Sequence, residues 1–273
     1  MSPVQPLLVL AGAGKMGGAM LEGWLKLGLD GADVVVIDPA PAAEMLALCE
    51  KAGVRVNPPP AGLTPPETLV LAVKPQKLDA AAPALAPLAA RETLVVSVIA
   101  GKTIADLQAR LPHAGAFIRA MPNTPASVGR GITGAACSAA VTGKQRAKAG
   151  SLLRAIGQLV WLDDEALIDA VTAVSGSGPA YVFFLAECMA KAGEAAGLPA
   201  NVAMKLARAT VEGAGELLYQ AHDVSPAQLR VNVTSPAGTT AAALGVLMAD
   251  DGLQPLMTRA IAAAKRRAGE LAG

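Results

Sequence analysis

Three glycines near the N-terminus have the spacing of a phosphate-binding loop. The stretch "VLAGAGKMGGAM" places them at Gly12, Gly14 and Gly17, with Lys15 and Met16 between the last two. Glycine allows a tight turn at the first position, close approach of a pyrophosphate at the second, and close helix–strand packing at the third. The N–H groups at the start of the following helix favour phosphate. We therefore expect all five residues to bind a dinucleotide; the alternative is a purely structural glycine turn.

An acidic residue follows at the distance expected of a ribose ligand. Asp38 ends an apolar run and lies 21 residues after Gly17, close to the ~20 residues usual in dinucleotide-binding folds. A carboxylate there accepts a hydrogen bond from the ribose 2′-hydroxyl and repels a 2′-phosphate. No positive charge follows before Lys51. The sequence thus favours NAD(H), although Arg55 could fold back towards a phosphate and weaken that preference.

A second candidate site lies in the uncharged stretch from Val231 to Ala249, which contains "NVTSPAGTTAAAL". Its Ser, Thr, Pro and Gly make it too polar for a core helix, and its lack of charge is unusual for a surface loop. The N–H groups around Ser235, Gly238 and Thr239 precede an expected helix and could hold an anion without any arginine. Ordinary helix capping by the hydroxyls is the alternative.

The elements that must position these residues follow two patterns. Continuous apolar runs, typical of strands buried on both faces of a parallel sheet, occupy 7–10, 33–37, 68–73, 93–99 and 116–120. Helical segments separate them, and "GITGAACSA" and "GQLVWLD" predict further strands near the sheet edge. Beyond residue 162 we expect helices only, at 165–173, 179–196, 199–220, 226–231, 238–249 and 252–271.

This alternation predicts an α/β protein with two domains. Residues 1–162 would form a Rossmann-type dinucleotide-binding domain, and residues 163–273 an all-α domain. The helical half is rich in small residues, such as Ala209, Gly213 and Ala214, and would bury little area alone. We infer that it packs against a second copy of the chain, which makes the protein a homo-oligomer.

Composition limits the other partners. The formal net charge is +1 without a basic cluster, so no nucleic acid is expected. Cys49, Cys137 and Cys188 form no CxxC pair, so neither a metal site nor a disulfide is expected. Glycine and proline interrupt the uncharged windows 170–186 and 231–249, so we expect no membrane span. No signal-peptide pattern begins the chain, and a cytoplasmic location follows.

Further motifs lie where strands end, and the carboxyl ends of parallel strands share one crevice. They are "LAVKPQ" (71–76), "IAGKTI" (99–104) and "IRAMPNTP" (118–125). Together with "LIDAVTAVSGSGPAYVF" (167–183) and "NVTSPAGTTAAAL" (232–244), they resemble the Δ1-pyrroline-5-carboxylate reductase family in order and spacing. The resemblance extends from Gly12 to about Leu244.

The resemblance implies an enzyme that uses NAD(P)H to reduce the cyclic imine of 1-pyrroline-5-carboxylate to L-proline, the last step of proline biosynthesis. It also implies a C-terminal helical dimerisation domain, intertwined dimers that often assemble into rings, and an active site between the domains with the helical half contributed across the dimer. Many members that favour NADPH carry Ser, Asn or Arg where this chain has Asp38, which puts NADPH preference in doubt.

Carried over to this sequence, the family motifs place Ala72, Lys74, Pro75 and Asn123 along the cofactor. Thr240 becomes the hydroxyl that contacts the imine nitrogen, as a proton donor or relay. A protonated imine is already electrophilic and the nicotinamide supplies the hydride, so little further acid–base machinery is needed.

Two other residues keep alternative roles. "SGSGPAY" places Ser175 either at the substrate or in a hinge between the domains. Arg119 is either part of the site or a structural tie between strand ends.

Two competing functions remain open from the sequence. Another small imine or β-hydroxyacid dehydrogenase would need a catalytic lysine in the helical domain, where Lys191, Lys205 and Lys265 belong to no recognisable motif. A catalytically inactive nucleotide-sensing protein would bind cofactor without turnover. It would leave the intact "TSPAGTT" loop unexplained.

Overall fold

The computed structural model describes residues 6–59 and 63–272. Contacts within the chain divide it into two compact units, Met1–Gly176 with Lys265–Gly273, and Ser177–Ala264. This contact-based division lies beyond the sequence-based boundary at residue 162, which stays a prediction. The last helix contributes residues to both units.

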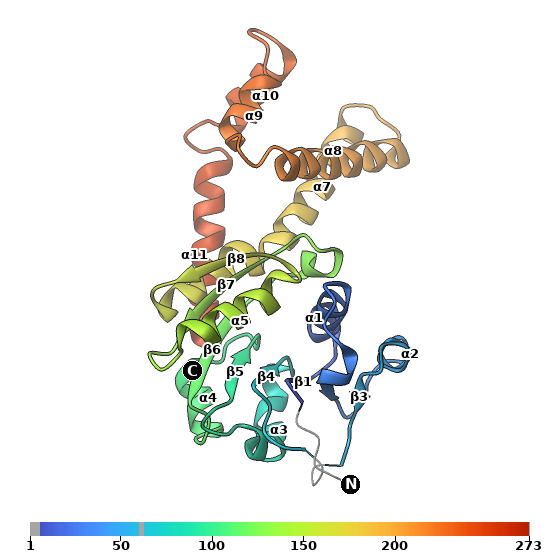
Figure 1. The fold of residues 1–273 in the computed structure, drawn as a ribbon. Coiled ribbons are helices and arrows are strands. Elements are labelled where there is room, and N and C mark those ends of the chain that lie inside the picture. Colours follow the sequence, from blue (N-terminus) through green and yellow to red (C-terminus); the bar gives the residue numbers. More distant parts are fainter. Residues whose placement is uncertain (1–5, 60–62, 273) are drawn as a thin grey trace. The chain divides into compact units, whose positions relative to one another are not determined.

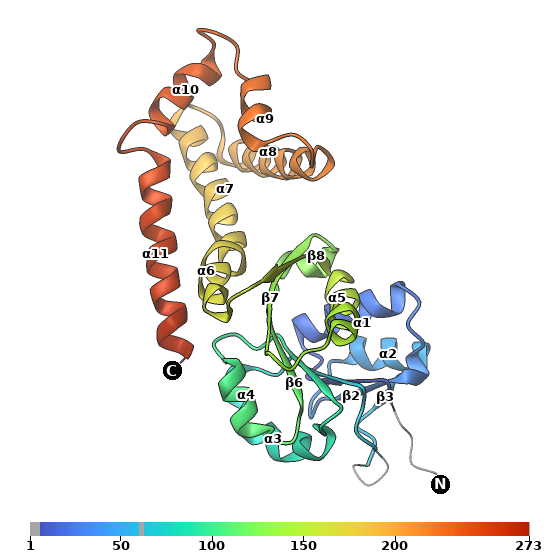
Figure 2. The same ribbon diagram turned by 60° about the vertical axis from the view of Figure 1, so that its left-hand side comes forward.

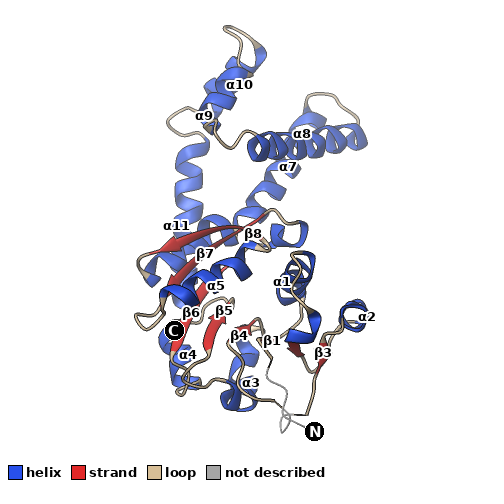
Figure 3. Cartoon of the chain, viewed as in Figure 1, coloured by secondary structure: helices blue, strands red, loops and turns tan. Residues whose placement is uncertain are grey.

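The first unit contains one eight-stranded sheet in the order β3-β2-β1-β4-β5-β6-β7-β8, drawn in red in Figure 3. Its neighbouring strands are parallel except for the antiparallel pair β6 and β7. The strands are β1 (Leu8–Ala11), β2 (Val34–Ile37), β3 (Arg55–Val56), β4 (Thr68–Leu71), β5 (Leu94–Ser97), β6 (Ala116–Met121), β7 (Gly131–Cys137) and β8 (Gly157–Leu162). All seven predicted strands are confirmed, and the last two lie at the edge as expected.

Helices cover both faces of this sheet because alternate strand residues point to opposite sides. Leu8, Leu10 and Val36 pack against one set of helices, while Val9 and Val35 pack against the other. The first face carries α1 (Lys15–Lys26), α2 (Ala43–Ala52) and α5 (Gly143–Arg154), and the second carries α3 (Leu78–Leu85) and α4 (Ile104–Arg110). Figure 2 shows these two layers on either side of the strands. The α/β fold class is confirmed.

The second unit is helical, as predicted (Figure 1). A short α6 (Ile168–Val171) and a π-helical turn (Thr172–Gly176) lead into it. They are followed by α7 (Gly178–Ala195), α8 (Ala200–Gln220), α9 (Pro226–Asn232), α10 (Thr239–Leu247) and α11 (Leu253–Ala272). Pro179 lies in the first turn of α7, and Pro199 is the N-cap of α8.

The sequence predicts that the glycines of "SGSGP" interrupt the helical run, but in the structure they do not. One stretch in the described part of the chain, Glu165–Ala195, is long and apolar enough by length and composition to cross a membrane. The physical reason is the π-helical turn, which carries the helix through Thr172–Gly176 and so joins α6 to α7. Only 11% of the apolar window is buried within the chain, so its exposed surface needs another explanation.

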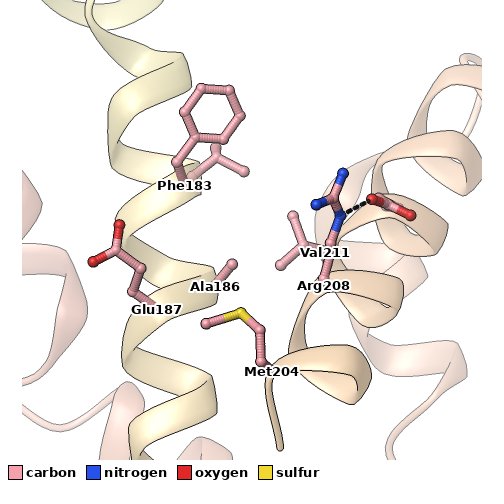
Figure 4. A pocket seen from close by; sticks show the side chains of 8 residues that line it. Phe183, Ala186, Glu187, Met204, Arg208 and Val211 are labelled. Atoms are coloured by element: carbon pink, nitrogen blue, oxygen red, sulfur yellow. Dashed lines mark hydrogen bonds and ion pairs between the residues drawn. The ribbon is translucent and has the colours of Figure 1, made fainter. Parts of the chain in front are cut away.

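That exposed surface borders a groove between α7 and α8. The residues that line it include Phe183, Ala186 and Glu187 of α7 and Met204, Arg208 and Val211 of α8, which Figure 4 labels. The groove encloses about 360 Å³. Phe183 and the adjacent Phe184 are 65% and 61% exposed, respectively. Large apolar patches of this kind mark interaction surfaces, in agreement with the inference that a second copy covers this half.

Candidate functional site

The Gly-rich loop joins β1 to α1 and contains two positions where only glycine fits. Gly12 has φ +91°, and a Cβ there would lie 2.7 Å from the Ala72 carbonyl oxygen. A Cβ on Gly17 would collide with the Gly12 carbonyl oxygen. The turn is therefore tight, and the start of α1 lies directly against it, as the sequence predicts.

Gly14 differs because nothing lies within 4 Å of the place its Cβ would take. It is the N-cap of α1, makes no side-chain cap, and no acidic residue occupies the first turn. The N–H groups of the first turn, from Lys15 onwards, have no partners inside the helix. This open, positively polarised helix end fits a phosphate.

A hollow of about 410 Å³ opens beside this helix end. Its lining includes Ala13, Gly14, Lys15, Gly18, Glu44 and Ser127. Lys15 is exposed, whereas Met16 is half-buried and packs on the core. The loop and its hollow have the size and the donors that a dinucleotide phosphate needs.

The order of the sheet places two predicted stretches together. Strand order reverses between β1 and β4, and ligands bind at such a switch point. Ala72 directly follows β4, and its N–H donates to the Ala11 carbonyl at 2.7 Å. Lys74 and Pro75 follow in a 3₁₀ turn, with the Lys74 side chain exposed. Ala72 therefore borders the Gly-rich loop, while cofactor contact by Lys74 and Pro75 stays a prediction.

Asp38 follows β2, and its carboxylate is bonded to the Gly-rich loop. Oδ2 accepts from the Ala13 N–H at 2.7 Å, and Oδ1 accepts from the Ala40 N–H at 2.9 Å. A carboxylate oxygen can accept two hydrogen bonds, so both retain capacity for a ribose hydroxyl. The Arg55 guanidinium instead donates to the Ala32 carbonyl at 3.4 Å, before the start of β2. The alternative, in which Arg55 folds back towards a phosphate, stays a prediction.

Asn123 is buried and has a structural contact. Its Oδ1 accepts from the Ile132 N–H at 2.9 Å, which joins the end of β6 to β7. The 3₁₀ turn that begins after it, Thr124–Val128, packs against α1. Asn123 thus positions a turn beside the cofactor hollow, and its own contact with cofactor stays a prediction.

Arg119 is the structural tie that the sequence left open. It is 5% exposed and bonds to Glu165 Oε1 at 3.2 Å and to Asp169 Oδ1 at 3.4 Å. Glu165 Oε1 also accepts from the Ile104 N–H at 2.8 Å. Strand β6, the start of α4 and the segment before α7 are therefore held by one ionic network.

We expect Arg119→Met to lower the free energy of unfolding by about 3 kcal/mol, because two half-buried carboxylates lose their counter-charge. Urea unfolding at fixed protein concentration measures this change. Lys26→Met is the control, since the exposed Lys26–Glu22 pair is worth at most about 0.5 kcal/mol. Equal stability of the two variants would contradict the structural role of Arg119.

Ser175 lies in the π-helical turn of the first unit. Its hydroxyl donates to the Val171 carbonyl at 3.0 Å, and Thr172 makes the same kind of bond to Ile168 at 2.8 Å. π-Helical turns occur frequently at functional sites. Ser175 retains acceptor capacity, and its contact with substrate stays a prediction.

The "TSPAGTT" loop belongs to the second unit and leads into α10, which begins at Thr239. The N-cap is Gly238, and no side chain caps the helix. Thr234 donates to the Arg230 carbonyl at 2.6 Å. Within the described chain, the hydroxyls of Ser235, Thr239 and Thr240 make no hydrogen bond. Helix capping therefore does not explain these three hydroxyls.

The turn itself brings backbone donors together. The Gly238 N–H donates to the Ser235 carbonyl at 3.1 Å, and Ala237 has φ +53°. A Cβ on Gly238 would collide with the Ser235 hydroxyl oxygen, so a larger residue there would displace this hydroxyl. The result is an uncharged helix N-terminus with free hydroxyls, which can hold a carboxylate and donate one further hydrogen bond.

The lysines required by the competing dehydrogenase hypothesis have no such setting. Lys191, Lys205 and Lys265 are all exposed on helices. No group of three or more His, Cys, Asp and Glu side chains in residues 6–59 and 63–272 is placed to hold a metal. Neither observation supports a different catalytic centre.

Two family models match the chain in separate regions. "Pyrroline-5-carboxylate reductase dimerisation" covers residues 165–271, and "NADP oxidoreductase coenzyme F420-dependent" covers residues 7–101. The first region includes the exposed α7 surface and the "TSPAGTT" loop, and the second includes the Gly-rich loop, Asp38 and Ala72.

Individual proteins match over the whole length. Pyrroline-5-carboxylate reductase of Pseudomonas aeruginosa is 41% identical over 267 residues, which are 98% of this chain and 97% of the relative. The structure of a pyrroline-5-carboxylate reductase from Coxiella burnetii has a TM-score of 0.89 at 34% identity and covers 99% and 100% of the two chains. The Plasmodium falciparum pyrroline carboxylate reductase, solved with NADP bound, has a TM-score of 0.76 at 24% identity and covers 100% of both chains. This last likeness concerns the fold alone.

Proposed function

We propose that two half-sites perform the reaction of this chain. The chain belongs to the pyrroline-5-carboxylate reductase family and reduces 1-pyrroline-5-carboxylate to L-proline with a nicotinamide cofactor. The Gly-rich loop and its neighbours hold the cofactor. The "TSPAGTT" loop holds the substrate. The observation that carries this division is the uncapped N-terminus of α10, whose hydroxyls have no structural use.

For the cofactor half, the residues present fit a dinucleotide. The N–H groups that follow Gly14 bind the pyrophosphate, and Asp38 binds the adenosine ribose. Ala72, Lys74 and Pro75 line the nicotinamide side, beside the switch point between β1 and β4. When bound, the cofactor supplies the hydride.

For the substrate half, α10 binds the carboxylate through N–H groups at Thr239 and Thr240, with help from the Ser235 hydroxyl. This arrangement requires no arginine. The Thr240 hydroxyl then donates a hydrogen bond to the ring nitrogen and relays a proton to it, which a solvent water replaces on the threonine oxygen, so the C=N carbon is electrophilic and the nitrogen is protonated as the carbon accepts the hydride. Ser175 is an additional polar contact to the substrate.

The decisive assay is oxidation of NADH and of NADPH by the purified protein with 1-pyrroline-5-carboxylate. Proline formation in step with cofactor oxidation supports the assignment. Cofactor binding without turnover would favour the inactive nucleotide-sensing alternative. Oxidation of NAD(P)H only by another small imine, or reduction of NAD(P)+ by a β-hydroxyacid, would favour the competing dehydrogenase.

Asp38 leads us to propose a preference for NADH over NADPH. By contrast, the P. falciparum structure with the same fold has NADP bound. We expect Asp38→Ser to lower the ratio of kcat/KM for NADH to kcat/KM for NADPH by roughly tenfold or more, because a charged hydrogen bond to the ribose and the repulsion of a 2′-phosphate are both lost.

The control for this prediction is Arg55→Ala. The Arg55 side chain bonds to the Ala32 carbonyl, so its removal leaves the cofactor ratio within about twofold if it plays no part in cofactor choice. An unchanged ratio in Asp38→Ser, or a larger change in Arg55→Ala, would contradict ribose recognition by Asp38.

We also propose that the enzyme is a cytoplasmic homodimer whose dimers assemble into rings, with a helical dimerisation domain that starts after residue 162. The matched dimerisation region and the exposed phenylalanines of α7 support a second copy on this surface. In the proposed dimer, the two half-sites come from different subunits. Mixing equal amounts of Gly14→Val and Thr240→Val proteins and exchanging subunits should then restore about a quarter of the wild-type activity, because about half of the dimers are mixed and each mixed dimer has one intact site; no recovery would contradict sharing between subunits.

A further inference from the structure

Asn57 holds both main-chain polar groups of Asp38. Its Oδ1 accepts from the Asp38 N–H at 2.9 Å, and its Nδ2 donates to the Asp38 carbonyl at 2.6 Å. Its own N–H donates to the Val36 carbonyl at 2.9 Å. Strand β3 ends one residue earlier, at Val56, so a side-chain amide replaces the strand pairing that would otherwise hold the end of β2.

The backbone of Asn57 is adapted to this contact. Its φ is +48°, in the left-handed region that asparagine tolerates better than most residues. Asp38 is in turn bonded to the Gly-rich loop, because its Oδ2 accepts a hydrogen bond from the Ala13 N–H. Asn57, Asp38 and the Gly-rich loop therefore form one hydrogen-bonded series.

We propose that Asn57 is a positioning residue for cofactor choice and acts through Asp38. The inference rests on the proposed reading of the ribose by Asp38. A carboxylate distinguishes a hydroxyl from a phosphate only if it is held within a fraction of an ångström of the productive position. The Asn57 amide holds the main chain of Asp38, and the Ala13 N–H holds the Asp38 carboxylate.

The variant that isolates this role is Asn57→Gly, because glycine keeps the left-handed backbone and removes only the amide. We expect the KM for NADH to rise about fivefold. The KM for NADPH should change less, because a less tightly held Asp38 carboxylate also repels the 2′-phosphate of NADPH less. The kcat and the KM for 1-pyrroline-5-carboxylate should stay within about twofold. A purely structural role would instead lower the fraction of active enzyme and affect both cofactors alike.

A double-mutant cycle with Asp38→Ser separates this inference from the proposed function. If Asn57 acts through Asp38, adding Asn57→Gly to Asp38→Ser changes neither KM further. An equal rise in the KM for NADH in both backgrounds would mean direct contact with the cofactor and would overturn the inference.

Two further outcomes are distinguishable. A shifted cofactor ratio in Asp38→Ser with no change in Asn57→Gly would reject the role of Asn57 and leave ribose recognition intact. No shift in Asp38→Ser would reject both. The thermal unfolding midpoint of Asn57→Gly, measured beside that of Arg55→Ala in the adjacent strand β3, establishes that each comparison is made on folded enzyme.

Discussion

Replacing Thr240 by valine is expected to lower kcat by about 100- to 1,000-fold, the usual cost of losing a positioned proton donor. The KM for 1-pyrroline-5-carboxylate should change by less than about threefold, because backbone N–H groups at the start of α10 hold the carboxylate. Valine has nearly the shape of threonine, and the Thr240 hydroxyl has no partner in the described chain. Stability should therefore be unaffected.

Two comparisons sharpen this prediction. Thr240→Ser restores a hydroxyl and should return kcat to within about tenfold of the wild type. Thr258→Val removes an exposed hydroxyl on α11 that donates to the Gln254 carbonyl and accepts from the Gln254 side-chain amide, and it should leave kcat unchanged. A kcat near normal in Thr240→Val would rule out its hydroxyl as the proton donor and would leave the imine nitrogen to be protonated by water.

The fold could be predicted where local pattern and tertiary burial agree. The continuous apolar runs gave five central strands, and the helices of the second unit begin and end within a few residues of the predicted ranges. Strand β3 was missed because Arg55–Val56 is too short to have a pattern. Helix α4 was expected only as a helical segment without bounds between two strands, and α5 was left out, although Thr103 with Asp106 and Thr142 with Gln145 form capping boxes that the sequence displays.

The glycines of "SGSGP" illustrate a limit of local rules. Glycine and proline usually end a helix, yet the chain passes through Thr172–Gly176 as a π-helical turn and continues into α7. Neighbouring structure decides this outcome. A Cβ on Gly176 would lie 2.8 Å from the terminal methyl of Met121, so a larger residue there would require this flexible side chain of β6 to move.

The candidate site could be predicted where the chemistry depends on neighbours in sequence. The glycine loop and the uncharged turn before α10 are of this kind. The partners of Asp38 and Arg119 are not, because they depend on pairing across the fold. Asn57 lies 19 residues from Asp38, and Glu165 and Asp169 lie 46 and 50 residues from Arg119.

The Gly14→Val substitution tests whether glycine at this position is required for cofactor binding and not for folding. No atom lies within 4 Å of a Cβ at Gly14, and its φ of −70° suits any residue. We therefore expect an unchanged unfolding midpoint. Affinity for NADH and NADPH should fall about 100-fold, because the side chain occupies the space through which phosphate reaches the N–H groups of α1.

Two other glycines provide the contrast. Gly12→Ala should lower stability by about 1–3 kcal/mol, because the left-handed φ of +91° strains any side chain. Gly143→Val, at the first position of α5 with equally open space around it, should change neither stability nor cofactor binding. Calorimetric titration with each cofactor measures the affinities. Wild-type affinity in Gly14→Val would mean that the pyrophosphate does not lie on this helix end, because nothing in the fold itself requires glycine at that position.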